Sequence, residues 1–305
     1  MNRLWIAGIA FAASTTMVAA EVNFSGYGRF GLLYDEGADE TAGEDEVRLE
    51  SRFRLNIDAI VESEAGVTFE ARVRLQADDN ADGTADTASL NGARFEASAG
   101  GLRVQVGNIA GVFDDESTVL YFGYEAGLID AIGQYSTFQG PIVEYDSTGS
   151  GVNGVSVLYE TGPFAIMANY NDETSDAPEA TEVGVSYSFG DYTVAVGYGM
   201  QDNPTDDIEY YVATFDGTIG DLDFSLFVGD DDIGDEVAYG ASGRYQIAAA
   251  TQIIASVAAG GGDDVEEAFG VGFRHDLGGG ASFRGMVGQN EDGDGIADLG
   301  VRFDF

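Results

Sequence analysis

The sequence lacks several residue types on which common catalytic and metal sites depend. Its 305 residues include no cysteine and only one histidine, which excludes disulfides, thiolate metal sites and multi-histidine zinc sites. Lysine is absent too, so all thirteen basic residues are arginines, against 54 acidic residues. The formal net charge of −41 excludes nucleic acid as a partner, because a phosphate backbone requires a basic surface.

The first 20 residues have the features of a secretory signal peptide. Arg3 supplies the positive charge, residues 4–13 form a short apolar core, and small residues precede a cleavage site after Ala20. No later segment approaches the length of about 18 apolar residues that a transmembrane helix requires. We therefore predict that residues 1–20 are removed and that residues 21–305 form one domain outside the cytoplasm.

Apolar and polar residues alternate along most of this domain, which predicts β-strands with one apolar and one polar face. The alternation is sharpest in residues 47–61 and 67–76. Short turns and longer acidic loops alternate between such segments, and one connection, from about residue 109 to 154, is far longer. Five segments precede this connection and eleven follow it, so the sequence predicts sixteen strands.

Two architectures fit this alternation, a soluble sandwich and a membrane barrel. A sandwich would bury one face in a dry core, whereas a barrel directs its polar face into a water-filled lumen. Four arginines decide between them, because they lie in mid-strand on one face and a dry core would desolvate them at high cost. They are Arg52, Arg54, Arg72 and Arg74. The predicted fold is all-β, a 16-stranded antiparallel transmembrane β-barrel.

Several stretches resemble the sixteen-stranded general diffusion porins of the outer membrane, of the type found in purple non-sulfur alphaproteobacteria. Residues 21–32 are similar to the first strand of that family, residues 188–198 to a hairpin, and residues 276–282 and 296–303 to the last two strands. The terminal Phe305 resembles the signal that the outer-membrane assembly machinery recognises. The resemblance implies outer-membrane lipid around the barrel of a Gram-negative bacterium, a homotrimer, no required cofactor, and a third loop folded into the lumen.

The candidate constriction residues are arginines of the first strands and acidic residues of the long loop. Six arginines share the polar phase of the first four strands, namely Arg29, Arg52, Arg54, Arg72, Arg74 and Arg94. The loop of about residues 109–154 contributes Asp114, Asp115 and Glu116. In the family that the chain resembles, such a basic patch faces an acidic third loop across the narrowest point of the pore. The alternative is that these arginines are ordinary lumen charges paired locally with Glu50, Glu70 and Glu96.

Two acidic loops have oxygen-bearing residues at the spacing of calcium-binding loops. The first set is Asp78, Asn80, Asp82 and Asp86, and the second is Asn290, Asp292 and Asp294. Each loop also has the glycine that a sharp turn around Ca²⁺ requires, but neither has the glutamate that would complete an EF-hand. Calcium binding by these loops is therefore one prediction, and a chance match in acidic loops is the alternative.

The predicted function is passive diffusion of ions and small hydrophilic solutes through an outer-membrane channel. A cation preference is expected, because the net charge of −41 raises the cation concentration at the pore mouth. A substrate-selective porin is one alternative, and a secreted calcium-dependent β-rich binding or structural protein is another. An enzyme is not expected, because the only imidazole, that of His275, lies at a strand end on the apparent lipid-facing phase.

Overall fold

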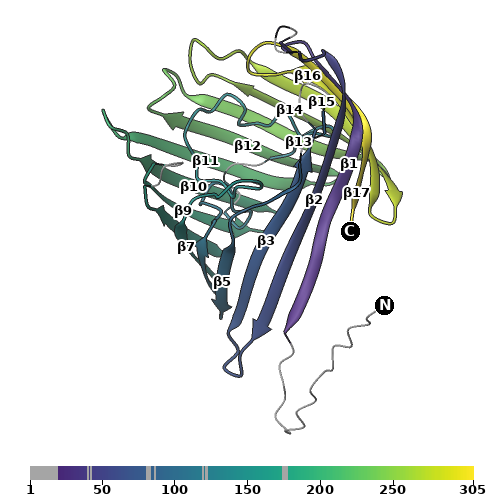
Figure 1. Cartoon of the computed structure of the whole chain (residues 1–305). Coiled ribbons are helices and arrows are strands. Elements are labelled where there is room, and N and C mark those ends of the chain that lie inside the picture. The colour runs from purple at the N-terminus through teal and green to yellow at the C-terminus, as the bar shows by residue number, and fades with distance from the viewer. Residues whose placement is uncertain are drawn as a thin grey trace, which may run out of the picture.

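The computed structural model describes residues 20–305, apart from residues 40, 42, 80–83, 86, 119, 121–122 and 174–177. The predicted signal peptide therefore lies outside the described residues, except for Ala20. In the part of the chain that the structure describes, no helix has the length and apolarity needed to cross a membrane. The described elements are all β-strands, and Figure 1 shows that they wrap around a common interior.

The strands before the long loop are β1 (Glu21–Asp35), β2 (Val47–Glu62), β3 (Thr68–Asp78), β4 (Ser89–Leu90), β5 (Arg94–Ala99) and β6 (Leu102–Gly107). The strands after it are β7 (Gly154–Thr161), β8 (Phe164–Asn171), β9 (Ala180–Phe189), β10 (Tyr192–Gln201), β11 (Ile208–Ile219), β12 (Leu222–Asp231), β13 (Ala238–Ala248), β14 (Thr251–Ala259), β15 (Ala268–Gly278), β16 (Ala281–Gln289) and β17 (Gly295–Asp304).

Apart from β4 and β5, which do not pair with each other, every strand pairs antiparallel with its neighbours in the sequence, and the last strand closes the sheet against the first. In the β1–β17 pairing, Tyr27 lies opposite Asp304 and Asp35 lies opposite Ile296. The short strands β4 and β5 both pair with β3, so they form one barrel strand that is interrupted at residues 91–93. The seventeen elements therefore make a closed barrel of sixteen strands, which confirms the predicted fold and the predicted number of strands before and after the long loop.

The alternation in the sequence corresponds to the two faces of the barrel wall. On β9, Val183 is 45% exposed and points outward, while its neighbour Glu182 is 0% exposed and points inward. On β14, Val257 is exposed and Ser256 is buried in the same way. The outward face is thus apolar along its length, as a wall surrounded by acyl chains requires.

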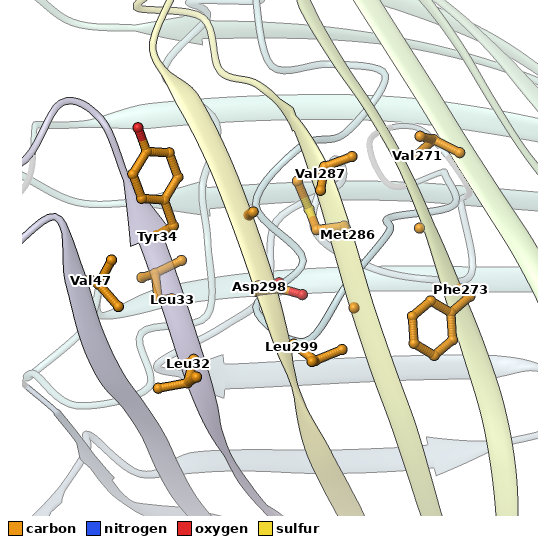
Figure 2. Close-up of a pocket in the computed structure, with 13 residues that line it drawn as sticks. Leu32, Leu33, Tyr34, Val47, Val271, Phe273, Met286, Val287, Asp298 and Leu299 are labelled. Carbon is orange, nitrogen blue, oxygen red and sulfur yellow. The ribbon is translucent and has the colours of Figure 1, made fainter.

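The outer face has a shallow apolar depression of about 530 Å³ over β1, β15, β16 and β17. Figure 2 shows Leu32 and Leu299 on adjacent strands of this surface, with Val271 farther across it. Gly285 leaves part of this space, because a Cβ atom there would lie 2.7 Å from Leu299 Cδ1 on the outward face. Because this depression lies on the outward face, it is separate from the path of solutes through the lumen.

The long segment between β6 and β7, residues 108–153, packs against the inward face of the wall. Several of its apolar side chains are fully buried there, including Val112, Phe113, Leu128 and Ile132, each 0% exposed. We call residues 108–153 the inner loop. Its position inside the barrel explains why so many apolar residues occur in a connection without strands of its own.

Inward-facing glycines of the wall provide the space into which the inner loop packs. A Cβ atom added to Gly197 of β10 would lie 2.8 Å from Leu120 Cδ1 and 2.9 Å from Phe113 Cε1. A Cβ atom added to Gly300 of β17 would lie 2.5 Å from Leu128 Cδ2. Both approaches are too close for a real side chain, so glycine on the inward phase allows the loop to lie directly on the backbone of the wall.

Candidate functional site

A buried carboxylate on β9 fixes both ends of the inner loop. Glu182 accepts hydrogen bonds from the backbone N–H of Val112 (2.7 Å) and of Val143 (2.8 Å), and from the hydroxyl of Tyr210 (2.8 Å). Three donors thus converge on one buried side chain, and each would be costly to leave without an acceptor. Glu182 therefore holds together two parts of the loop that are about 30 residues apart in sequence.

The middle of the inner loop is fixed on the opposite side of the barrel. Asp298 of β17 accepts the backbone N–H groups of Leu128 (2.8 Å) and Ile129 (3.0 Å). Ser256 of β14 donates to the carbonyl of Ile132 (2.7 Å). With these contacts the loop extends across the lumen from β9 to β17, so the open path must pass beside it.

A cavity of about 630 Å³ lies between the inner loop and the wall formed by β2, β3, β5 and β6. Seven of the nine predicted constriction residues line it, namely Arg54, Arg72, Arg74, Arg94, Asp114, Asp115 and Glu116. The structure thus brings the predicted basic wall and the acidic start of the loop into one water-accessible space. Glu116 and Glu144 are exposed within it, while Asp115 is buried.

Three arginines of this cavity are neutralised by carboxylates at ion-pair distance. Arg72 pairs with Asp58, and Arg94 pairs with Glu70 at 3.3 Å. Arg103 of β6 pairs with Asp115 of the inner loop. Sequence reasoning omitted Arg103, although its position between the apolar Leu102 and Val104 already places it on the inward phase.

Arg54 and Arg74 differ from the other three, because no described carboxylate forms an ion pair with either of them. Arg54 donates to Gln76 and to the hydroxyl of Ser147 (3.3 Å). Arg74 donates to Asn56 (2.9 Å) and to the same Ser147 hydroxyl (2.6 Å). These two guanidinium groups keep their full positive charge on the wall of the cavity.

Arg29 and Arg52, the other two predicted constriction residues, do not line this cavity. Arg29 is 6% exposed, forms an ion pair with Glu50 at 2.6 Å and donates to the carbonyl of Leu128. It is buried because the inner loop covers it. Arg52 is bound to Asp78 and also donates to Tyr27 (3.5 Å). Local pairing with Glu50, part of the alternative considered from the sequence, describes Arg29, and the pairing of Arg94 with Glu70 also matches that alternative.

A second group of arginines lies on the inward face of the last strands and was missed by sequence reasoning. Arg244, Arg274 and Arg284 line a smaller cavity of about 170 Å³ together with Glu125 and Asp130 of the inner loop. Arg302 of the last strand, β17, connects this group to the arginines of the first strands. Closure of the barrel places Arg302 opposite Arg29 in the β1–β17 pairing. The basic wall therefore extends across the seam of the barrel.

Two acids of the inner loop are held in an environment that disfavours their charged form. Burial raises the pKa of Asp114 to about 7, although its carboxylate accepts the backbone N–H of Tyr145, and nearby Glu144 and Asp115 raise that pKa further. Burial also raises the pKa of Glu125 to about 7, opposed by a hydrogen bond from Tyr135. Asp114 lines the larger cavity and Glu125 the smaller one, so the charge of both cavities changes near neutral pH.

The two loops predicted to bind calcium differ in what the structure describes. Both carboxylate oxygens of Asp78 are occupied, one by Arg52 and the other by the amide of Gln76, and the other predicted ligands of that loop, Asn80, Asp82 and Asp86, lie outside the described residues. In the second loop, Asn290 accepts the backbone N–H groups of Asp292 (3.2 Å) and Asp294 (2.8 Å), as in a turn. Among the described residues, no group of three acidic or histidine side chains is arranged to hold a metal ion.

The whole barrel, rather than a single site, is shared with proteins of known class. The sequence profile described as Gram-negative porin matches residues 5–295. The chain belongs to this porin family. It is 32% identical over 310 residues to the porin of Fuscovulum blasticum, which covers 93% of this chain and all of that protein. The porin of Rhodobacter capsulatus is 26% identical over 325 residues with the same coverage.

Solved structures support the same assignment. A triple mutant of the porin of Rhodopseudomonas blastica superposes with a TM-score of 0.79 at 26% sequence identity, and the match covers 93% of this chain and 100% of that one. The chain is therefore an outer-membrane porin, a channel for passive diffusion of ions and small solutes, and not an enzyme. The resemblance to alphaproteobacterial porins is confirmed, and the alternative of a secreted binding protein is excluded.

Proposed function

We propose that this porin prefers cations and that its narrowest point lies between the inner loop and the arginines of β2, β3, β5 and β6. The observation that carries the proposal is the charge of the inner loop. It contains seven acidic residues and no basic one, and several of these acids line the cavity beside the wall. A permeating ion passing the loop therefore meets fixed negative charge.

The arginines of the wall offset this negative charge only in part. Five arginines and six acidic residues line the larger cavity, and three of the arginines are already paired with carboxylates. The whole chain has a net charge of −41, so the pore mouth concentrates cations before they reach the cavity. Both contributions favour cations.

The reversal potential in a KCl gradient across a planar bilayer tests this proposal. We expect a cation preference that weakens as salt rises, because the Debye length falls from about 10 Å at 0.1 M to about 3 Å at 1 M. Replacing Arg54 and Arg74 by glutamine should strengthen the preference. A matched control is Arg48→Gln, which removes one inward-facing arginine already paired with Asp35. An anion preference of the unmodified channel would overturn the proposal.

We further propose that the functional assembly is a homotrimer, as the resemblance to diffusion porins implies. Purified in mild detergent, the mature chain should migrate without heating as a single oligomer and after heating as a monomer. Multi-angle light scattering of the unheated protein, corrected for detergent, should give the mass of three copies. A monomer or a dimer in that measurement would contradict this part of the proposal.

A further inference from the structure

Arg54 and Arg74 converge on one neutral oxygen inside the pore. The Ser147 hydroxyl of the inner loop accepts from Nη2 of Arg54 at 3.3 Å and from Nη1 of Arg74 at 2.6 Å. Each guanidinium has five N–H donors, and the bonds of each described here go to neutral oxygens only. Two cations that share one neutral acceptor can bind an oxyanion more strongly than that acceptor.

Aromatic rings hold both guanidinium groups in place without using their donors. Arg54 lies 5.2 Å from the centre of the Tyr27 ring, and Arg74 lies 4.6 Å from the centre of the Tyr145 ring. Stacking of this kind restricts the side chain while leaving its in-plane N–H groups free to bind a ligand. Arg54, Arg74 and Tyr145 all line the 630 Å³ cavity, so a solute in the pore can reach the two arginines.

The same cavity carries fixed negative charge on its loop side. Glu116 and Glu144 are exposed there, beside the partly buried Asp114. A simple anion is attracted by Arg54 and Arg74 but repelled by these carboxylates, and a simple cation experiences the reverse. A solute with a carboxylate at one end and an ammonium group at the other is complementary to both sides.

We infer that the cavity is a saturable binding site for small zwitterionic solutes of the amino-acid class. The carboxylate of the solute replaces Ser147 as acceptor for Arg54 and Arg74, and its ammonium group lies toward Glu116 and Glu144. This inference rests on the proposed path between the inner loop and the arginine wall. It goes beyond passive diffusion, because it predicts that one class of solute is retained in the pore.

The test is the single-channel conductance in about 0.1 M KCl, where screening is modest, with ω-amino acids from glycine to 6-aminohexanoate added. We expect a saturable fall in KCl conductance whose half-saturating concentration depends on chain length. In the double variant Arg54→Gln/Arg74→Gln that concentration should rise about tenfold or more, since hydrogen bonds between charged partners are lost. The control Arg274→Gln, which removes an exposed arginine elsewhere on the inward face, should leave it unchanged.

Acetate and ethylammonium serve as the matched singly charged solutes, and both should reduce the conductance less than the best zwitterion. No saturable effect of any ω-amino acid on a conducting channel, or an equal effect in the double variant, would overturn the inference. If the double variant forms no channels, the single variants Arg54→Gln and Arg74→Gln replace it. The reversal potential in KCl alone tests the cation preference separately, because ω-amino acids carry no net charge at neutral pH.

Discussion

Replacement of Glu182 should release the inner loop from the wall without unfolding the barrel. In Glu182→Ala, the backbone N–H of Val143 and the hydroxyl of Tyr210 lose the acceptor that they have at 2.8 Å. Val112 keeps a second acceptor, Oδ1 of Asn169, at 2.8 Å. Each buried donor left without an acceptor costs about 1–3 kcal/mol, so two donors cost about 2–6 kcal/mol.

This cost falls on docking of the loop, because the strand pairing of β9 does not involve the side chain of Glu182. A loss of about 2 kcal/mol corresponds to about 30-fold faster opening of the loop ends. The milder variant Glu182→Gln keeps one carbonyl oxygen for Val143 and Tyr210 and should change the opening far less.

Hydrogen–deuterium exchange measured by mass spectrometry on residues 109–116 and 141–146 reports this opening directly. Both segments should exchange at least about 30-fold faster in Glu182→Ala, while the segments of β12 to β14 keep their protection. Glu160→Gln changes an exposed glutamate at the end of β7 and is the matched control. Unchanged exchange of both loop segments in a folded Glu182→Ala channel would refute this account of loop anchoring.

Three further predictions follow from the same contacts. Asp114 and Glu125 are neutral below a pKa of about 7 and ionise above it, so the cation preference should rise between pH 6 and pH 8. The reversal potential measures this rise, and Asp114→Asn/Glu125→Gln should abolish it; a rise that persists in this variant would contradict the assignment. In Gly197→Ala the added methyl meets Leu120 and Phe113 of the inner loop, at a cost of about 1–3 kcal/mol. Its conductance should therefore fluctuate more than that of Gly243→Ala, and an equally steady current in both would contradict this packing. The signal peptide should be cleaved after Ala20, so the intact mass of the purified protein should equal that of residues 21–305. A mass that places the first residue several positions from Glu21 would refute the predicted site.

The architecture was predictable because alternation along each strand reports directly on the two sides of the wall. Residues such as Val183 and Glu182 differ in environment as their order in the sequence implies. The same alternation placed Arg54, Arg72 and Arg74 on the inward face. Strand number followed from the spacing of turns, and the long connection stood out by length alone.

The missed features depend on contacts between segments far apart in the sequence. Arg29 is buried because Leu128 of the inner loop lies over Gly31 and Gly300, and alternation cannot show what covers an inward-facing residue. Arg302 joins the basic wall only because β17 pairs with β1. Considering the barrel as a closed ring would have placed the arginines of the last strands beside those of the first.

The route of permeating ions past the inner loop is the central claim, and cysteine modification tests it most directly. The chain has no cysteine, so one introduced thiol reacts alone. Ser117→Cys lies in the cavity beside the arginine wall, whereas Ser256→Cys lies beneath the loop, where Ser256 donates to Ile132. A negatively charged methanethiosulfonate reagent should lower the single-channel conductance of Ser117→Cys and leave that of Ser256→Cys unchanged. A fall in conductance at Ser256→Cys with none at Ser117→Cys would show that ions take a different path.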